Sequence, residues 1–119
     1  MKYLITSLLV FVLSFQCYAT KNDCKWTKRK HPDTFHAIKE WCLRENPNNK
    51  ENQAYWMQKQ CNAFRAIAQK WTANETEDRK IITHALLRWG WLKGDKFPNT
   101  PEIINYYLVY MEYRQKTEK

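Results

Sequence analysis

Residues 54–71, AYWMQKQCNAFRAIAQKW, decide the fold of this chain. Apolar side chains recur in this stretch at alternating intervals of three and four residues, which is the spacing that places them along one side of an α-helix. The members of this seam are Ala54, Met57, Cys61, Phe64, Ala68 and Trp71. The stretch therefore predicts a helix of more than three turns that packs against the rest of the protein through a narrow apolar face.

Another helix is predicted before the seam. Residues 33–45 carry apolar side chains at helical spacing, and these are Phe35, Ile38, Trp41 and Cys42. Asn46-Pro47 should end this helix, because the residue before a proline avoids helical backbone angles. Asn48, with Glu51 three residues later, forms a capping pattern that should start the seam helix. We expect the two helices to form an antiparallel hairpin about Pro47.

Two more helices are predicted after the seam. Asn74 with Glu77 repeats the capping pattern, and the helix it starts should end near Gly94. The motif at 100–102, TPE, supplies a capping hydroxyl, a proline at the first helical position and an acid near the positive end of the helix dipole. No segment alternates with a period of two residues for long enough to predict a strand. The expected fold class is all-α, a compact single-domain bundle of about four helices with one disulfide.

The N-terminus has the layout of a secretory signal peptide. Lys2 supplies a positive charge, an apolar run extends from Leu4 to Phe15, and the motif CYA at 17–19 ends in small residues that suit cleavage after Ala19. About a dozen apolar residues are too few to span a bilayer, which takes ~20. We therefore predict residues 1–19 as a signal peptide, residues 20–119 as an exported helical domain, periplasmic or secreted, and no transmembrane segment.

Three cysteines remain after this cut: Cys24, Cys42 and Cys61. One disulfide is expected in an oxidising compartment. In a hairpin about Pro47, Cys61 lies ~12 Å along the helix axis from the level of Cys42, whereas bridged Cα atoms lie within ~7 Å of each other. We therefore predict a Cys24–Cys61 disulfide, with Cys24–Cys42 as the alternative, and Cys42 as a buried reduced thiol.

The chain is basic. It has 20 Lys+Arg and 12 Asp+Glu, a net charge of +8, and removal of Lys2 with the signal peptide leaves 19 against 12, or +7. The densest cluster lies in a basic N-terminal arm, residues 20–32. Its candidate binding residues are Lys25, Trp26, Lys28, Arg29 and Lys30. Cations around an aromatic side chain suit an anionic partner, and a solvated mobile arm is the alternative.

Two further surfaces are candidates for recognition. The packing arc of the predicted third helix consists of Ile81, Ile82, Ala85, Leu86, Trp89 and Leu92. Leu87, Arg88 and Trp91 fall outside that arc, so the Leu–Trp pair is either covered by the Phe97-Pro98 loop or offered to a partner.

The predicted fourth helix is apolar nearly all round. One of its faces carries the candidate binding residues Tyr106, Tyr110 and Tyr113, and tyrosine-rich faces suit recognition. Such a helix is central in its bundle or lies at an interface. A homodimer through this helix, or through a spare cysteine, is therefore an alternative.

Motifs for catalysis and for metal or cofactor binding are missing from the sequence. His36 and Glu40 stand four residues apart and can share a helix face, but no motif ties a nucleophile or a second acid to them. The cysteines lack the C-x-x-C spacing of zinc sites. We predict that the protein is not an enzyme and uses no cofactor or metal.

The expected function is binding. Small exported helical proteins with a basic balance and surplus aromatic faces include periplasmic inhibitors, immunity proteins and exclusion factors, which neutralise or recognise another macromolecule. The expected partner is another protein or an anionic surface, and not nucleic acid. One alternative is a secreted carrier of a small apolar ligand, with an internal cavity lined by Met57, Phe64, Tyr107 and Met111. Another is a small hydrolase that uses His36 or His84.

Overall fold

The computed structural model describes residues 23–73, 76–90, 97–98 and 104–118. Residues 23–30 are helical, and four helices follow: α2 (Pro32–Glu45), α3 (Lys50–Thr72), α4 (Thr76–Arg88) and α5 (Tyr106–Thr117). The all-α prediction is confirmed, because these residues contain helices and no strand. Within the described residues there are five helices rather than about four, since residues 23–30 of the basic arm add one. The predicted signal peptide lies outside the described residues.

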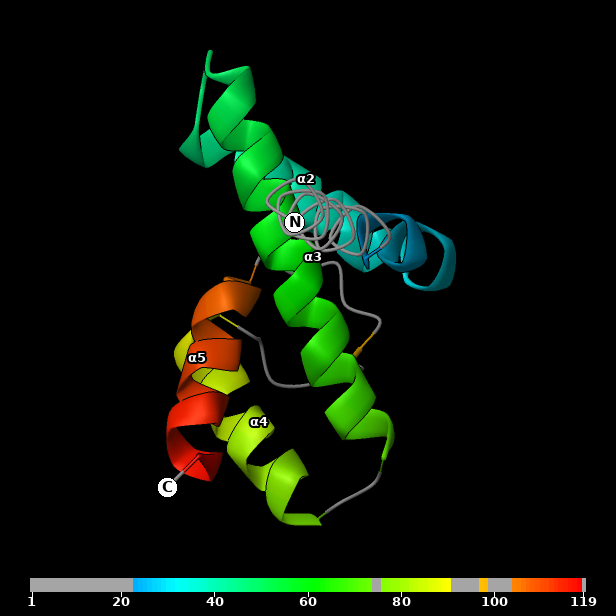
Figure 1. The fold of residues 1–119 in the computed structure, drawn as a ribbon, viewed down its shortest axis with the longest axis vertical. Helices are drawn as coiled ribbons and strands as arrows, with labels where there is room; N and C mark the ends of the chain where they lie inside the picture. Colours follow the sequence, from blue (N-terminus) through cyan, green and yellow to red (C-terminus); the bar gives the residue numbers. More distant parts are fainter. Residues whose placement is uncertain (1–22, 74–75, 91–96, 99–103, 119) are drawn as a thin grey trace, which may run out of the picture.

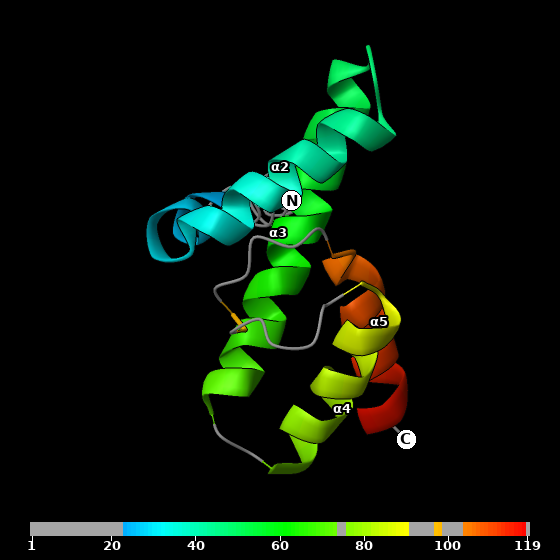
Figure 2. The ribbon, with the colours of Figure 1, turned by 180° about the vertical axis from the view of Figure 1, so that it is seen from behind.

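α3 is the central helix (Figure 1). Of the other labelled helices, α2 packs only against α3, whereas α4 and α5 pack against α3 and against each other. Figure 2 shows α2 crossing the N-terminal part of α3 obliquely, while α4 and α5 lie beside its C-terminal part. α2 therefore covers mainly the first half of α3, which also meets the start of α5, where the ring centroids of Trp56 and Tyr107 lie 5.9 Å apart.

Phe64 of the predicted seam lies at the centre of the core. It is fully buried, and its ring centroid lies 5.0–6.2 Å from the ring centroids of Trp26, His31, Phe97 and Tyr106. These tilted and edge-to-face contacts are the favourable geometries for aromatic pairs. One side chain of α3 thus joins the N-terminal helical residues, the turn at 97–98 and α5.

The predicted seam is correct over most of its length. Cys61 and Ala68 are buried together with Phe64, and Trp71 is half-buried with its ring centroid 5.1 Å from that of Phe97. The first member, Ala54, is exposed instead. Where Ala54 lies, the oblique crossing of α2 leaves a groove beside α3 rather than a packed interface.

The helix ends differ from the prediction in two places. α3 is capped by Asn49, whose side chain accepts a hydrogen bond from the backbone N–H of Asn52 at 3.0 Å, and not by Asn48. Asn48 takes a left-handed conformation with φ 62°, which asparagine tolerates. α4 ends at Arg88 and not near Gly94, because Gly90, two residues after Arg88, adopts φ 121° and so turns the chain.

Side chains from two places in the chain, Asn105 before α5 and Gln60 of α3, form hydrogen bonds at the start of α5. Asn105 caps α5, which begins at Tyr106, and Ile104 and Asn105 are not helical. The predicted start at residues 100–102 lies outside the described residues. Gln60, fully buried on α3, donates to Asn105 Oδ1 at 2.9 Å and accepts from the backbone N–H of Tyr107 at 3.2 Å. A buried amide from α3 therefore supplements the cap of α5, as buried polar groups require partners.

The predicted disulfide is confirmed. Cys24 and Cys61 are bonded, with their Cα atoms 5.1 Å apart. Beside this bond, Arg65 Nη1 donates to Asp23 Oδ1 at 2.8 Å, and the Arg65 guanidinium lies 5.0 Å from the Trp26 ring. These contacts hold helical residues 23–30 against α3.

Breaking this link should destabilise the protein. The crosslink joins residues 37 apart, and the double variant Cys24→Ser/Cys61→Ser should lower the free energy of unfolding by about 2–4 kcal/mol, because the unfolded chain regains entropy. Urea unfolding measures this loss. As a control, Cys42→Ala should retain the crosslink in non-reducing peptide mapping. Mapping that links Cys42 to either partner in the wild-type protein would contradict the structure.

The Cys42 thiol should be inert in the folded protein. Cys42 is unpaired and 1% exposed, and burial raises the pKa of its thiol to about 11. We expect iodoacetamide near neutral pH to leave Cys42 unmodified in the native state and to alkylate it in urea, as mass spectrometry of the non-reduced protein would show. Alkylation of the native protein at the unfolded rate would argue against this burial.

Tyr113 should make stability sensitive to alkaline pH. Its hydroxyl donates to Asp78 Oδ1 at 2.8 Å, and burial, with smaller contributions from the bond to Asp78 and the charge of Asp78, raises the pKa of Tyr113 to about 12. The folded state therefore holds this proton more tightly than the unfolded state, in which the pKa is ~10. The stabilisation is complete below pH ~10 and is lost as the pH rises to about 12.

Urea unfolding of wild type and Tyr113→Phe across this pH interval tests the prediction. The difference in free energy of unfolding between the two proteins should fall as the pH rises, because only the wild type loses this contribution. A difference that stays constant with pH would show that Tyr113 titrates alike in both states.

Candidate binding groove

An open groove lies between α2 and the N-terminal half of α3. Its volume is about 330 Å³. Its apolar lining includes Phe35 and Leu43 on α2 and Met57 on α3, with Cys42 and Ala54 between them. Leu43 is 45% exposed, and Phe35 and Met57 are half-buried. The groove therefore presents apolar surface to solvent.

Three lysines from three helical segments line this groove: Lys28, Lys39 and Lys50. All three are exposed, and none of the nine lining residues is acidic. The Lys28 ammonium lies 5.8 Å from the centroid of the Phe35 ring, so one of the charges stands directly over the apolar lining. Within the described ranges, none of the three forms an ion pair. The groove is thus apolar inside and positive at its edges.

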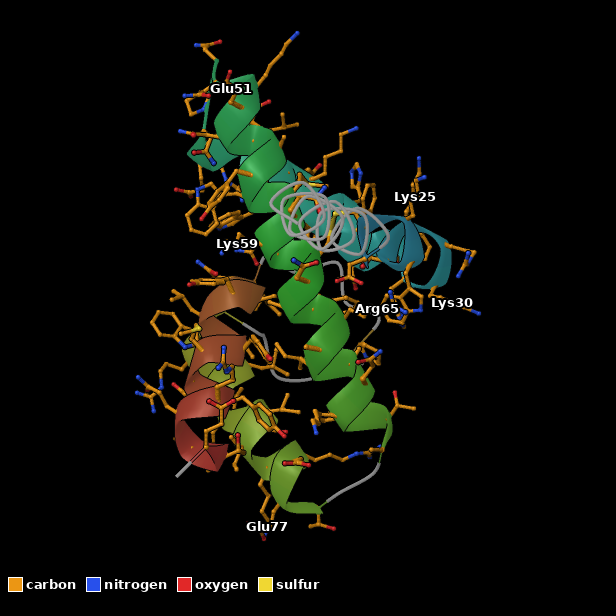
Figure 3. The ribbon with its side chains drawn as sticks, in the orientation of Figure 1. Lys25, Lys30, Glu51, Lys59, Arg65 and Glu77 are labelled. Carbon is orange, nitrogen blue, oxygen red and sulfur yellow. A yellow bond between two sulfur atoms is a disulfide. The ribbon has the colours of Figure 1, made fainter. Side chains whose placement is uncertain are left out.

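Lys28 reaches the groove because residues 23–30 of the basic arm are helical. Thr27 is fully buried, and Trp26 is half-buried and in ring contact with Phe64. The predicted cations Lys25, Lys28, Arg29 and Lys30 are all exposed. Figure 3 shows Lys25 and Lys30 projecting away from the body of the protein. Of the predicted arm residues, Lys28 therefore lines the groove and Trp26 belongs to the packing.

The predicted surface on α4 is only partly described. Leu87 is 49% exposed, Arg88 is exposed and pairs with Glu112 of α5 (Nε to Oε1, 2.9 Å), and Trp91 lies outside the described residues. Trp89, predicted to pack, is 36% exposed, because α4 ends one residue before it. Leu87 and Arg88 are accessible. The predicted pairing of Leu87 with Trp91 lies outside the described residues, because Trp91 is not among them.

Phe97 does not cover Leu87. Phe97 is buried, and its ring centroid lies 5.9 Å from that of Phe64 and 5.1 Å from that of Trp71. Thr34 Oγ1 donates to the backbone carbonyl of Pro98 at 2.8 Å and so ties this turn to α2. The turn at 97–98 is therefore part of the core, and the cover predicted for Leu87 is absent there.

The tyrosine face of α5 points largely inward. Tyr106 and Tyr113 are buried, and Tyr110 is half-buried with the Arg114 guanidinium 5.7 Å from its ring centroid. An almost wholly apolar helix is central or at an interface, and here two of its tyrosines, Tyr106 and Tyr113, pack in the core. Tyr106 and Tyr113 therefore offer no surface to a partner in this fold.

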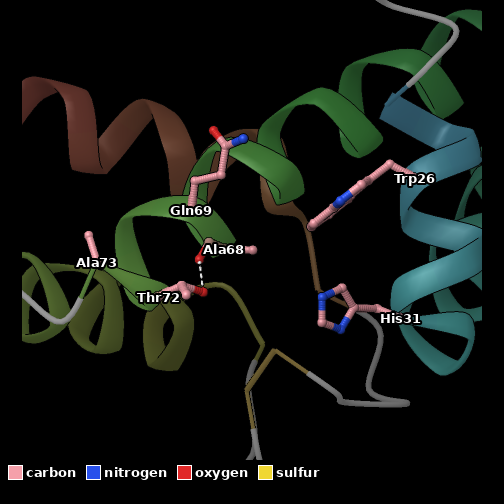
Figure 4. A pocket seen from close by; sticks show the side chains of 6 residues that line it. All are labelled: Trp26, His31, Ala68, Gln69, Thr72 and Ala73. Atoms are coloured by element: carbon pink, nitrogen blue, oxygen red, sulfur yellow. Dashed lines mark hydrogen bonds between the residues drawn. The ribbon is translucent and has the colours of Figure 1, made fainter.

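A second pocket, of about 420 Å³, lies between the N-terminal helical residues and the end of α3 (Figure 4). The rings of Trp26 and His31 face Ala68, Gln69 and Thr72 across it. The two ring centroids lie 5.3 Å apart, and Thr72 Oγ1 donates to the carbonyl of Ala68 at 2.8 Å. No lysine, arginine or carboxylate is among its lining residues. The lining of this pocket therefore indicates the chemical class of a ligand less clearly than the lining of the groove with its three lysines.

The residues proposed for the two alternative functions do not converge on a site. His36 Nε2 and Glu40 Oε1 lie 3.1 Å apart, as the shared helix face predicts, but both side chains are more than half exposed. His84 is also exposed. No group of three His, Cys, Asp or Glu side chains in the described residues is arranged to hold a metal ion.

The four residues proposed to line a carrier cavity do not enclose one together. Phe64 is fully buried among other rings, and Met111 is 37% exposed at the surface of α5.

Four residues of the groove are not among the binding residues predicted from the sequence: Phe35, Lys39, Leu43 and Lys50. Phe35, Lys39 and Leu43 stand four residues apart, so they share one face of α2. This periodicity was a usable signal for a face with both apolar and basic character. Whether that face is covered by other residues depends on how α2 crosses α3. The spacing of residues along α2 does not determine this crossing.

Comparison with known proteins adds no relative. No protein-family model matches the chain, and neither the curated proteins nor the solved structures contain a match. Among the helices that the structure describes, none combines the length and the apolar character needed to cross a membrane.

Residues at the edge of the groove should be replaceable without loss of stability. Lys39→Glu and Leu43→Ser should each change the free energy of unfolding by less than about 1 kcal/mol, because Lys39 is exposed and Leu43 is 45% exposed at the edge of the groove. Ile38→Ala, at a neighbouring position that is 1% exposed, should cost about 2–5 kcal/mol. Urea unfolding of the three variants makes the comparison. A loss at Leu43 as large as that at Ile38 would assign Leu43 to the core.

Proposed function

We propose that this protein is a small exported helical protein that binds another macromolecule and so neutralises or recognises it, without catalysis of its own. The observation that carries the proposal is the groove between α2 and α3. It combines solvent-facing apolar surface at Leu43 with three lysines, Lys28, Lys39 and Lys50, that form no ion pair within the described residues.

The composition of the groove favours a partner over simple solvation. Covering exposed apolar surface stabilises a complex by roughly 25 cal/mol per Å², and Leu43 and Met57 offer such surface. Unpaired cations attract an acidic partner and raise its association rate. Apolar contacts inside a charged rim are the usual anatomy of a protein–protein interface. The apolar surface of the groove would thus contribute affinity, and its lysines would increase the rate of association with an acidic partner.

Export is part of the proposal. The first nineteen residues have the layout of a signal peptide, and the Cys24–Cys61 disulfide is compatible with an oxidising compartment. The basic balance of the chain adds long-range attraction to acidic surfaces. Periplasmic inhibitors, immunity proteins and exclusion factors are the class of exported binding proteins that these features fit.

The test is chemical crosslinking of tagged mature protein in an exported-protein extract of its host. Wild type should yield a defined crosslinked partner, and Lys39→Glu should reduce that yield strongly. Lys70→Glu is the matched control, because Lys70 is an exposed lysine at the far end of α3 and the charge change is the same. Rising salt should slow association of the wild type, since screening weakens steering.

Equal crosslinking yields from Lys39→Glu and Lys70→Glu would show that the groove does not bind the partner. No defined partner from the extract, together with a ligand-dependent rise in thermal stability on adding a small apolar compound, would favour the carrier instead.

A further inference from the structure

We propose that the partner contributes an acidic amphipathic helix that lies along the groove between α2 and α3. This inference rests on the proposed function and names the chemistry of the occupant. Apolar side chains on one face of the partner's helix would enter the groove, and carboxylates beside them would pair with the lysines. Such helix-in-groove binding is a recurrent mode of protein recognition.

The length of the groove suits about two helical turns. Its lining on α2 runs from Phe35 to Leu43, eight residues that correspond to ~12 Å at 1.5 Å per residue. Two turns of a partner helix span about the same distance and place apolar side chains at i, i+4 and i+7 on one face. The partner helix therefore needs no more than two or three apolar anchors.

The positions of the lysines call for several anionic groups rather than one. Lys28 stands over Phe35 in the first turn of α2, Lys39 lies one turn further along α2, and Lys50 is the first residue of α3, beyond the connection between the helices. The cations are thus distributed along the groove. A fatty acid or a lipid carries its charge at one end, whereas carboxylates on a helix recur every three or four residues.

The size of the groove also favours inserted side chains over an enclosed ligand. A volume of about 330 Å³ is at the low end for pockets that enclose a small molecule, which bury most of the ligand surface. The exposure of Leu43 and of all three lysines shows that the groove is open along its edge. A ligand there stays partly exposed, as a helix from a larger partner does.

The probe is a synthetic peptide of about twelve residues with leucines at i, i+4 and i+7 and glutamates on both flanks of that face. Calorimetry measures its affinity for the mature protein with the disulfide intact, and amide NMR shifts locate it. We expect shifts at Phe35, Lys39 and Leu43. Lys39→Glu and Leu43→Ser should each weaken binding more than about tenfold, whereas Lys70→Glu should change it less than about twofold.

Three comparisons can overturn the inference. A peptide of the same composition with its leucines scattered around the helix should bind at least about tenfold more weakly, and equal binding would remove the amphipathic requirement. A peptide with glutamine in place of glutamate should lose most of the affinity, and unchanged binding would remove the role of the lysines. Oleate, or vesicles of phosphatidylglycerol, binding in the groove more tightly than the acidic peptide would assign the groove to a lipid.

The outcomes separate this inference from the proposed function. If crosslinking in extract depends on Lys39 but the acidic peptide does not bind, the protein is a groove-dependent binder of a different partner chemistry and this inference fails alone. If neither the extract partner nor the peptide responds to Lys39→Glu, both fail.

Discussion

The Cys24–Cys61 disulfide is the constraint on which the surface of this protein depends. The helical segment at residues 23–30 packs against α3 through the ring contact of Trp26 with Phe64. The crosslink holds it against α3, where Arg65 pairs with Asp23 and packs on Trp26. Because that segment is held, Trp26 reaches the core at Phe64 and Lys28 reaches the groove. One covalent bond therefore supports both an aromatic core contact and a charge at the candidate site.

The two halves of α3 differ in how they are packed. Its C-terminal half is packed against α4 and α5, with Phe64 and Ile67 fully buried, and Gln60 marks the boundary by bonding to the start of α5. Its N-terminal half contacts α2, and it touches α5 through Tyr107, whose ring centroid lies 5.9 Å from that of Trp56. The oblique crossing of α2 leaves Met57 in an open groove. The buried residues of α3 therefore lie from Gln60 onward, and the earlier part of the helix exposes apolar surface in the groove.

The candidate site was only partly predictable from sequence. The basic cluster identified Lys28, because a run of cations is visible without any structure. Lys39 and Lys50 were missed, since each is an isolated lysine on its own helix and only the crossing of α2 and α3 brings them to one groove. The sequence predicts the tyrosines of α5 as binding residues because that helix is apolar nearly all round. Tyr106 and Tyr113 are instead buried, because α3 and α4 cover that face.

Local signals in the sequence were enough to predict the all-α class, the α3 seam and the Cys24–Cys61 pair. These features depend on periodicity and on helix rise, which are properties of the chain itself. The predicted end of α4 near Gly94 and the predicted cap at Asn48 are wrong, because α4 ends at Arg88 and Asn49 caps α3, and several residues nearby offer similar signals. Tertiary structure alone decided which apolar faces are covered and which lysines meet, since that depends on the angles at which helices cross, and a helix with one apolar face can pack at several such angles.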